Sequence, residues 1–444
     1  MRPFIKRLAP LSFLLLAFPQ YSYARGGVES PSYWIKGLEA PEEVVLNSEE
    51  IKSLNRMTVG KTDQMADLNS MPEVIPDWQL LDWLLYDKVP YDWNTGRRFF
   101  SDGRRVKDAF LDGLIRNMNL DGVAVENAIT YGAVVERADI RAFPTDLAIL
   151  KRPGRLEFDT VQYSSIYPPE AVALLHTSRD GQWGFVQTGT VRGWIRMNKV
   201  AFGDRESAIE HGDDFLVVTG SSIKVYRDKG LKKVFSTVPM GALLDLSAPV
   251  GSQKRSYAVR FPQRDAGGSL VWAEAYVSKG ADLSVGFLPY TGKNVITQAF
   301  KMLGEEYGWG GKDGRRDCSE FIKDLFFTMG IMLPRNSRYQ GVSGDVLAYR
   351  DDAVSSEEII ESLKSARPGI TLLGLDRHIM LYLGERKGKP YAIHQIFGYK
   401  DGQRFRILNK VTVTDLELGR RSKAGPLKRR IRSVTEIRIP GAES

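Results

Sequence analysis

The chain has 444 residues, of which 43% are hydrophobic and 26% are charged. This length and composition indicate two to four globular domains and exclude an intrinsically disordered protein. The net charge of +8 is modest for such a long chain, so we do not infer a nucleic-acid partner. The single cysteine, Cys318, excludes an internal disulfide, so the fold depends on its cores alone.

The first 24 residues (1–24) have the three parts of a secretory signal peptide. Arg2, Lys6 and Arg7 form a basic start, residues 8–18 are apolar, and residues 22–24 place small side chains at the positions that flank a cleavage site. The apolar stretch is too short to span a bilayer, which needs about 20 residues. We therefore expect export to the periplasm or the extracellular space, with no stable membrane span after cleavage.

Residues 25–135 are predicted to form a mainly helical domain. Trp78, Leu81 and Leu84 recur at helical spacing, and residues 107–115 form a second amphipathic stretch. The sequence shows no catalytic pattern in this region.

Residues 136–204 and 205–288 contain short runs of β-branched and aromatic residues that are broken by turns. Each segment has about five such runs, which predicts two small all-β barrels of the SH3-like type. We expect these barrels to bind a ligand or to shape a site rather than to react.

Residues 289–444 change to helices followed by strands, which predicts an α+β domain with an antiparallel sheet. The predicted strands cover residues 371–375, 378–383, 391–396, 410–413 and 434–439.

Cys318 stands where a glycine-rich turn meets an amphipathic helix. A thiol at a helix N-terminus lies at the positive end of the helix dipole, which predicts a lowered pKa and a reactive thiolate. The alternative is a small buried hydrophobe, which is a common fate of free cysteine. The polar and charged residues that flank Cys318 favour the nucleophile.

His378 and His394 lie on two neighbouring predicted strands. If these strands pair antiparallel, the two imidazoles can meet near one end of the sheet. His378 would then be the general base for Cys318, and His394 would orient it. Either histidine taken alone is equally well explained as an ordinary core or surface residue. Because the sequence has no zinc motif, P-loop or Gly-x-Ser-x-Gly elbow, we expect no metal, no cofactor and no serine hydrolase.

These pieces, in this order, resemble the NlpC-type (NlpC/p-sixty) cell-wall cysteine peptidases, which have a reduced papain-like fold. The resemblance covers about residues 290–440 and rests on the following motifs: Tyr307-x-Trp309-Gly310-Gly311, Asp317-Cys318-Ser319, Leu333-Pro334-Arg335, His378 and His394. The preceding segments resemble exported members of the family that carry an N-terminal helical domain and two bacterial SH3-like domains.

The resemblance implies a peptidase that cuts peptidoglycan or murein stem peptides between γ-D-glutamate and the diamino acid, either diaminopimelate or lysine. It implies a catalytic set of Cys318, His378 and His394, with Tyr307 as an oxyanion donor. Asp317 and Ser319 correspond to positions that grip the free amine of the substrate. The other substrate-binding candidates are Trp309, Arg335 and, from the first barrel, Glu170.

The sequence departs from the family pattern at Glu320, where many members carry glycine, and at Ile379 and Met380 after the base. These departures leave the fine substrate preference open. Two other functions also stay open at this point: a catalytically silent wall-binding protein, and an amide or acyl transferase that uses the same cysteine.

Overall fold

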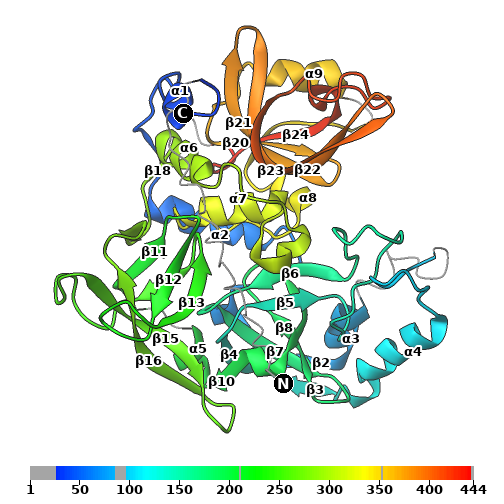
Figure 1. Ribbon diagram of the computed structural model, residues 1–444, viewed down its shortest axis with the longest axis vertical. Helices are drawn as coiled ribbons and strands as arrows, with labels where there is room; N and C mark the ends of the chain where they lie inside the picture. Colours follow the sequence, from blue (N-terminus) through cyan, green and yellow to red (C-terminus); the bar gives the residue numbers. More distant parts are fainter. Residues whose placement is uncertain (1–26, 86–96, 210–211, 352–353, 442–444) are drawn as a thin grey trace, which may run out of the picture.

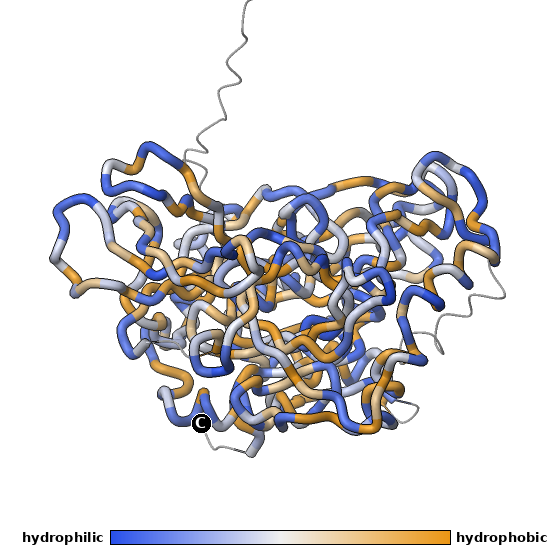
Figure 2. Tube along the Cα trace, turned by 90° about the horizontal axis from the view of Figure 1, so that it is seen from below, coloured by the Kyte–Doolittle hydropathy of each residue, from blue (hydrophilic) through white to orange (hydrophobic). Residues whose placement is uncertain are grey.

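The computed structural model describes residues 27–85, 97–209, 212–351 and 354–441, and the expected signal peptide (residues 1–24) lies outside these ranges. The chain is multidomain and rich in sheets. In Figure 1 the C-terminal domain lies at the top, the first barrel at the lower right and the second barrel at the lower left. Hydrophobic segments concentrate in the interior and hydrophilic loops lie at the rim (Figure 2). None of the helices within the described ranges is long and apolar enough to cross a membrane.

The first barrel is a seven-stranded sheet in the order β10-β4-β7-β8-β9-β5-β6. Its strands are β4 (Thr130–Val134), β5 (Ala138–Arg141), β6 (Gln162–Ile166), β7 (Ala171–Thr177), β8 (Trp183–Gln187), β9 (Arg192–Arg196) and β10 (Val200–Gly203). The sheet starts before residue 136 because β4 pairs with both β7 and β10 and buries Tyr131, Ala133 and Val134. These residues alternate poorly in the sequence, so only the pairing reveals the strand.

The second barrel combines a three-stranded sheet, β14-β11-β17, with a four-stranded sheet, β13-β12-β16-β15. Its strands are β11 (Phe215–Val218), β12 (Ser222–Tyr226), β13 (Val234–Pro239), β14 (Leu243–Asp245), β15 (Ser256–Arg264), β16 (Leu270–Ser278) and β17 (Leu283–Val285). A short helix, α5 (Arg205–Ile209), connects the two barrels. Alternating residues such as Ile223 and Val225 point into a core of their own.

The C-terminal domain has a six-stranded antiparallel sheet in the order β19-β24-β20-β21-β22-β23. Its strands are β19 (Asp345–Tyr349), β20 (Thr371–Leu375), β21 (His378–Arg386), β22 (Lys389–Asp401), β23 (Arg404–Asp415) and β24 (Ile431–Glu436). Its helices are α6 (Gly292–Lys301), α7 (Cys318–Phe327), α8 (Ser337–Gln340) and α9 (Ser356–Ser362), with short 3-10 segments at η5 (Trp309–Gly314), which is kinked, and η6 (Leu427–Arg430). One face of the sheet, with Leu381, packs on α6 and α7, and the other face, with Met380, packs on α9.

The N-terminal segment contains helices, but its buried side chains join two different cores. Its elements are α1 (Pro31–Ile35), β1 (Val44–Leu46), α2 (Ser48–Val59), η1 (Leu68–Ser70), β2 (Val74–Pro76), α3 (Asp77–Leu85), α4 (Asp108–Asn117), η3 (Leu120–Gly122) and β3 (Glu126–Ala128). Trp34 and Leu54 belong to the core of the C-terminal domain, where β1 also pairs with β18 (Tyr290–Thr291). Leu80 and Leu114 belong to the core under the first barrel. In the described ranges, no core consists of this segment alone, which differs from the expected separate domain at residues 25–135.

Candidate active site

The turn before Cys318 is shaped by its contact with the first barrel. Gly310 and Gly311 both have positive φ angles, of 59° and 76°. A Cβ atom on Gly311 would also collide with Ser165 of β6. Glycine is therefore required here for the backbone conformation and for the close approach of the barrel.

Cys318 is the first residue of α7, and Asp317 caps this helix. The Asp317 carboxylate accepts a hydrogen bond of 3.0 Å from the Glu320 N–H, as an N-cap residue does. The apolar face of α7, with Phe321 and Leu325, is fully buried in the core. The thiol is only 7% exposed, and the Ile379 N–H points at it, which places the sulfur at the start of β21.

His378 and His394 are in direct contact, because β21 and β22 pair antiparallel as the sequence predicted. His378 Nε2 lies 2.7 Å from His394 Nδ1, and His394 Nε2 lies 3.0 Å from the Thr414 hydroxyl oxygen on β23. We assign the proton on His378 to Nε2, so that it donates to His394 and leaves Nδ1 free to accept a proton. His394 then donates to Thr414.

Thr414 is a member of the site that the sequence interpretation missed. It lies one residue beyond the strand predicted at 410–413, on the strand that pairs with β22. The alternation of threonines at 412 and 414 is the only signal in the sequence, and it is informative only when the register with His394 is known.

Burial disfavours the charged forms of Cys318, His378 and His394. Burial raises the pKa of the Cys318 thiol to about 12, and the Asp317 charge acts in the same direction. Burial and the nearby Arg430 lower the pKa of His378 to about 4. Burial and His378 lower the pKa of His394 well below its usual value. The expected low thiol pKa is therefore wrong for the free protein, because burial and Asp317 outweigh the helix N-terminus and the Ile379 N–H.

Tyr307 and Trp309 lie on the other side of the nucleophile, in contact with the first barrel. Burial, followed by the charges of Cys318 and Asp317, raises the pKa of the Tyr307 hydroxyl far above its usual value, so it remains a hydrogen-bond donor beside the thiol. Phe158, from the barrel loop between β5 and β6, packs against the rings of Tyr307 and Trp309 at centroid distances of 6.4 and 5.4 Å.

Asp317, Ser319 and Arg335 contact one another in the interior instead of lining an open groove. The Arg335 guanidinium binds both Asp317 oxygens, at 3.0 and 2.7 Å, and the Ser319 hydroxyl at 2.7 Å. Burial alone would raise the pKa of Asp317, but Arg335 and the N–H groups of Glu320 and Gly310 lower it overall. A carboxylate that is already held in this way is poorly suited to grip a substrate amine, which was the role expected for Asp317 and Ser319.

Glu320 extends the same cluster to the first barrel. Its carboxylate lies 3.3 Å from Arg335 and accepts a hydrogen bond of 3.3 Å from Ser165, while Arg335 Nε donates to the Ser164 hydroxyl at 2.8 Å. Burial raises the pKa of Glu320 to about 7, although Arg335 opposes this shift. Glu320, at the position where the sequence departs from the glycine of the family pattern, therefore places a second acid in the interface between two domains.

Glu170 directly precedes β7 and is exposed. Its carboxylate accepts a hydrogen bond of 3.1 Å from the Tyr167 N–H, and the positive charge of Lys323 on α7 acts on it. The structure thus brings Glu170 close to α7, but beside Lys323 rather than beside Cys318.

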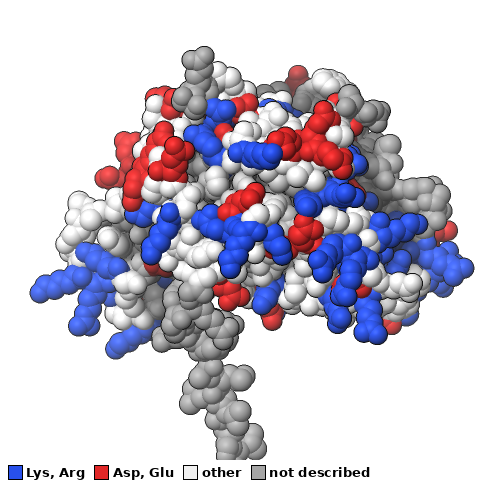
Figure 3. Space-filling model, turned by 90° about the horizontal axis from the view of Figure 1, so that it is seen from above, with Lys and Arg blue, Asp and Glu red and all other residues white. Residues whose placement is uncertain are grey.

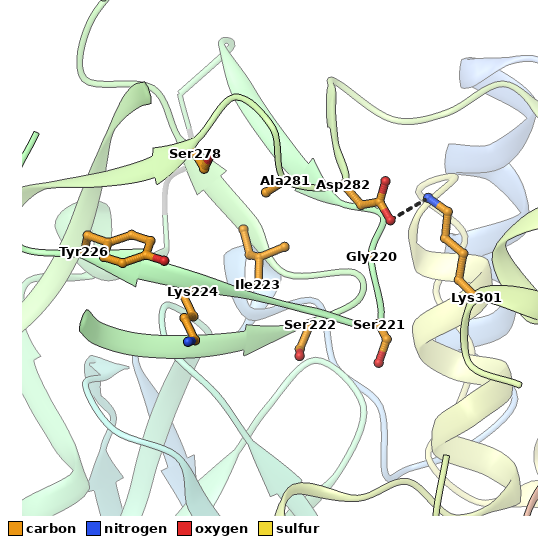
Figure 4. A pocket seen from close by; sticks show the side chains of 10 residues that line it. All are labelled: Gly220, Ser221, Ser222, Ile223, Lys224, Tyr226, Ser278, Ala281, Asp282 and Lys301. Carbon is orange, nitrogen blue, oxygen red and sulfur yellow. Dashed lines mark ion pairs between the residues drawn. The ribbon is translucent and has the colours of Figure 1, made fainter. Parts of the chain in front are cut away.

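A cavity of about 430 Å³ lies away from these residues, between the second barrel and α6 (Figure 4). Ser222, Lys224 and Tyr226 of β12 line it, and Asp282 and Lys301 close one end with an ion pair of 3.5 Å. None of the candidate site residues named above lines this cavity.

Comparison with known proteins identifies two domains in the chain. Residues 304–397 match the model of the NlpC/P60 family, and residues 151–196 match the model of an SH3 domain of the SH3b1 type. No curated protein matches the sequence.

Two solved structures are similar to this chain to different degrees. An NlpC/P60 endopeptidase from Photobacterium damselae subsp. piscicida is similar with a TM-score of 0.71 and 22% identity, over 91% of this chain and 96% of that chain. An NlpC/P60 family protein from Bacillus cereus has a TM-score of 0.49 and 16% identity, over 69% of this chain and 99% of that chain. The first likeness indicates a shared fold through most of the chain. The protein therefore carries an NlpC/P60 family domain at its C-terminal end and an SH3 domain of the SH3b1 type before it.

Proposed function

We propose that the protein is an exported cysteine endopeptidase that hydrolyses peptidoglycan stem peptides between γ-D-glutamate and the diamino acid. The observation that carries this proposal is the arrangement of three groups. The Cys318 sulfur lies at the start of β21, where His378 stands, and His378 is held by His394 at 2.7 Å. A nucleophile, a base and an orienting group in this order support acyl transfer.

In the proposed reaction, the Cys318 proton moves to His378 Nδ1 as the sulfur attacks the carbonyl carbon of the γ-glutamyl amide. The resulting oxyanion accepts hydrogen bonds from the Tyr307 hydroxyl and from the Cys318 backbone N–H at the start of α7. His378 then gives its proton to the departing amine, which leaves a thioester. Water, deprotonated by His378, attacks the thioester, releases the acid and restores the thiol.

The neutral resting state fits this sequence of steps. One proton moves within the pair, so the pair as a whole gains no net charge while it is buried. His394 and Thr414 stabilise the imidazolium through Nε2 of His378, because His394 Nδ1 accepts its proton.

The first barrel supports a preference for short peptides over the intact wall. Phe158 also packs against Phe397 of β22, at 5.0 Å, and so bridges the turn and the sheet beside the nucleophile. A barrel loop in this position limits how far a polymeric substrate can extend past Cys318.

Mass spectrometry of the products from two substrates tests the proposal. The substrates are purified murein sacculi and the free tripeptide L-Ala-γ-D-Glu-diaminopimelate. We expect release of L-Ala-γ-D-Glu from the tripeptide and little product from sacculi. Cys318→Ala should abolish cleavage and keep the circular dichroism spectrum. Retained activity in that folded variant, or cleavage at another bond, would contradict the proposal.

A wall-binding protein with a silent site is the second candidate, and the buried, protonated thiol is the observation that favours it. Alkylation of Cys318 by iodoacetamide, with and without the tripeptide, separates the two functions. A thiol that stays unreactive from pH 6 to 9, together with no product from either substrate, would support the silent protein.

A further inference from the structure

Arg430 lies at the same end of the sheet as the candidate base. At this edge β24 and β21 begin and β20 ends. Ile431 of β24 pairs with Leu375 of β20, and Leu375 pairs with His378 of β21. Arg430 directly precedes Ile431 and is the last residue of η6. Because adjacent strands lie about 4.8 Å apart, its backbone is about 10 Å from that of His378.

Arg430 is exposed, and within the described ranges its guanidinium forms no ion pair with a carboxylate. Other cations of the same segment are neutralised, since Arg421 binds Asp401 and Lys428 binds Glu417. Figure 3, which looks onto the C-terminal domain, shows many Lys and Arg side chains in the lower part of the view. The charge of Arg430 also reaches the site, because it lowers the pKa of His378.

His378 stands between Tyr307 and Arg430. The Tyr307 N–H donates to the Asn409 carbonyl of β23, so Tyr307 approaches from the β22–β23 side of the sheet. Arg430 approaches from the β20–β24 side. If the oxyanion forms beside Tyr307 and His378 protonates the departing amine, the leaving group extends past His378 toward Arg430.

We propose that Arg430 binds a carboxylate of the leaving diamino acid and so sets the specificity on that side of the scissile bond. A guanidinium presents a planar fork of donors that matches a carboxylate with two parallel hydrogen bonds. This inference rests on the proposed function, because it needs a leaving group that carries a carboxylate near its amine. Diaminopimelate carries two such groups.

The test compares two tripeptides with the full-length protein. One is L-Ala-γ-D-Glu-diaminopimelate with both diaminopimelate carboxylates free, and the other has both amidated. We expect the wild-type kcat/KM to be about tenfold to a hundredfold higher for the free acid. Arg430→Gln should remove this preference by lowering kcat/KM for the acid and leaving the value for the diamide unchanged. Arg430→Lys should restore part of it.

The matched control is Arg429→Gln, which removes an exposed arginine one residue earlier and should keep the preference. Arg430→Gln should also move the acid limb of the kcat/KM profile to higher pH, because the pKa of His378 rises when the positive charge is removed. An equal loss on both peptides, or a preference that survives in Arg430→Gln, would overturn the role of Arg430 alone. Failure of the wild type to cleave either peptide would overturn the proposed function, and the inference with it.

Discussion

The two barrels contact the same helix of the NlpC/P60 domain, but they do so on different sides and with different consequences. The first barrel reaches the N-terminal end of α7 through Ser164 and Ser165. The second barrel reaches α7 indirectly: the Ser221 carbonyl accepts a hydrogen bond of 2.9 Å from Arg316, which precedes α7 and binds Asp324 within it. Each contact depends on a buried arginine: Arg335 for the first barrel and Arg316 for the second.

The partners of these two arginines show what the difference means. Arg335 binds Asp317, which caps α7 next to the nucleophile. Arg316 binds Asp324, at 2.7 Å, and Glu305, at 2.9 Å, neither of which is a candidate site residue. The first barrel therefore contacts residues next to the candidate nucleophile, whereas the second barrel contacts the domain through residues outside the candidate site.

The largest effect is expected from removing each arginine. Arg335→Met leaves the buried carboxylates of Asp317 and Glu320 without their ion-pair partner, which costs about 3–5 kcal/mol in the free energy of unfolding. Arg316→Met should cost less, because Asp324 keeps its ion pair with Lys323 at 2.7 Å. Only Arg335→Met should also lower the kcat/KM of the folded fraction, because it frees Asp317. Urea unfolding and kinetics on folded protein give the two quantities. An equal loss of kcat/KM in both variants would break the distinction between the barrels.

A smaller effect is expected at the two acids, with opposite signs. The folded state raises the pKa of Glu320 from 4.5 to about 7, mainly through burial, so it favours the protonated form. The stability from Glu320 is thus complete below about pH 4.5 and is lost as the pH rises through about 7. Glu320→Gln should therefore stabilise the protein at pH 8 by about 3 kcal/mol and change little at pH 4.

Asp324, on the side of the second barrel, is the control. Burial opposes its charge, but Lys323 and Arg316 lower its pKa overall. Its stabilisation is present above its unfolded pKa and is lost as the pH falls, so Asp324→Asn should destabilise the protein at pH 8. Urea unfolding at both pH values checks both variants. Destabilisation by Glu320→Gln at pH 8 would contradict the expected opposite signs of the two acids.

One phenylalanine from each barrel region packs on the C-terminal domain, so a matched pair of alanine substitutions can compare the two barrels. Phe158 of the first barrel packs on Tyr307, whereas Phe287, which follows the last strand of the second barrel, packs on Phe327 at 5.9 Å. Phe158→Ala should lower kcat/KM on the tripeptide by about tenfold, because the Tyr307 donor loses its support. Phe287→Ala should lower only the thermal midpoint. Unchanged kcat/KM in Phe158→Ala would show that the contact between the first barrel and Tyr307 does not contribute to catalysis.

The smallest effect is expected at the ion pair between Lys301 and Asp282, seen in Figure 4. The two side chains are 24% and 63% exposed, so the pair contributes less than about 1 kcal/mol. Lys301→Met should leave kcat/KM unchanged and shift the unfolding midpoint only slightly. A clear kinetic effect would show that the second barrel also communicates with the site.

The sequence was sufficient for the features that depend on local patterns. The helix from Cys318, the strands of His378 and His394, and the glycine-rich turn all have a periodicity or a backbone requirement that can be recognised without the fold. The family expectation is confirmed for the NlpC/P60 domain and for one SH3 domain, at residues 151–196, whereas the SH3-like type of the second barrel stays a prediction.

The features that need tertiary contacts could not be predicted in the same way. No pattern in the sequence joins Arg335 to Ser164, which lies 171 residues away, or shows that Glu320 is buried against Ser165. The sign of the Cys318 pKa shift was also inaccessible, because it depends on burial that only the packed domains create. The N-terminal helices were recognised as helices, but the sequence does not show which core each of them joins.

The pairing of β1 with β18 has a consequence for the order of folding. Trp34, Leu46 and Leu54 complete the core of the C-terminal domain although they are synthesised about 250 residues before it. Domains generally fold in the order of their synthesis. This N-terminal segment can complete its packing only after the C-terminal domain has been synthesised. A fragment that begins at residue 289 would expose the apolar surface that Trp34 covers, so the folding unit of the NlpC/P60 domain includes the N-terminal segment that carries Trp34, Leu46 and Leu54.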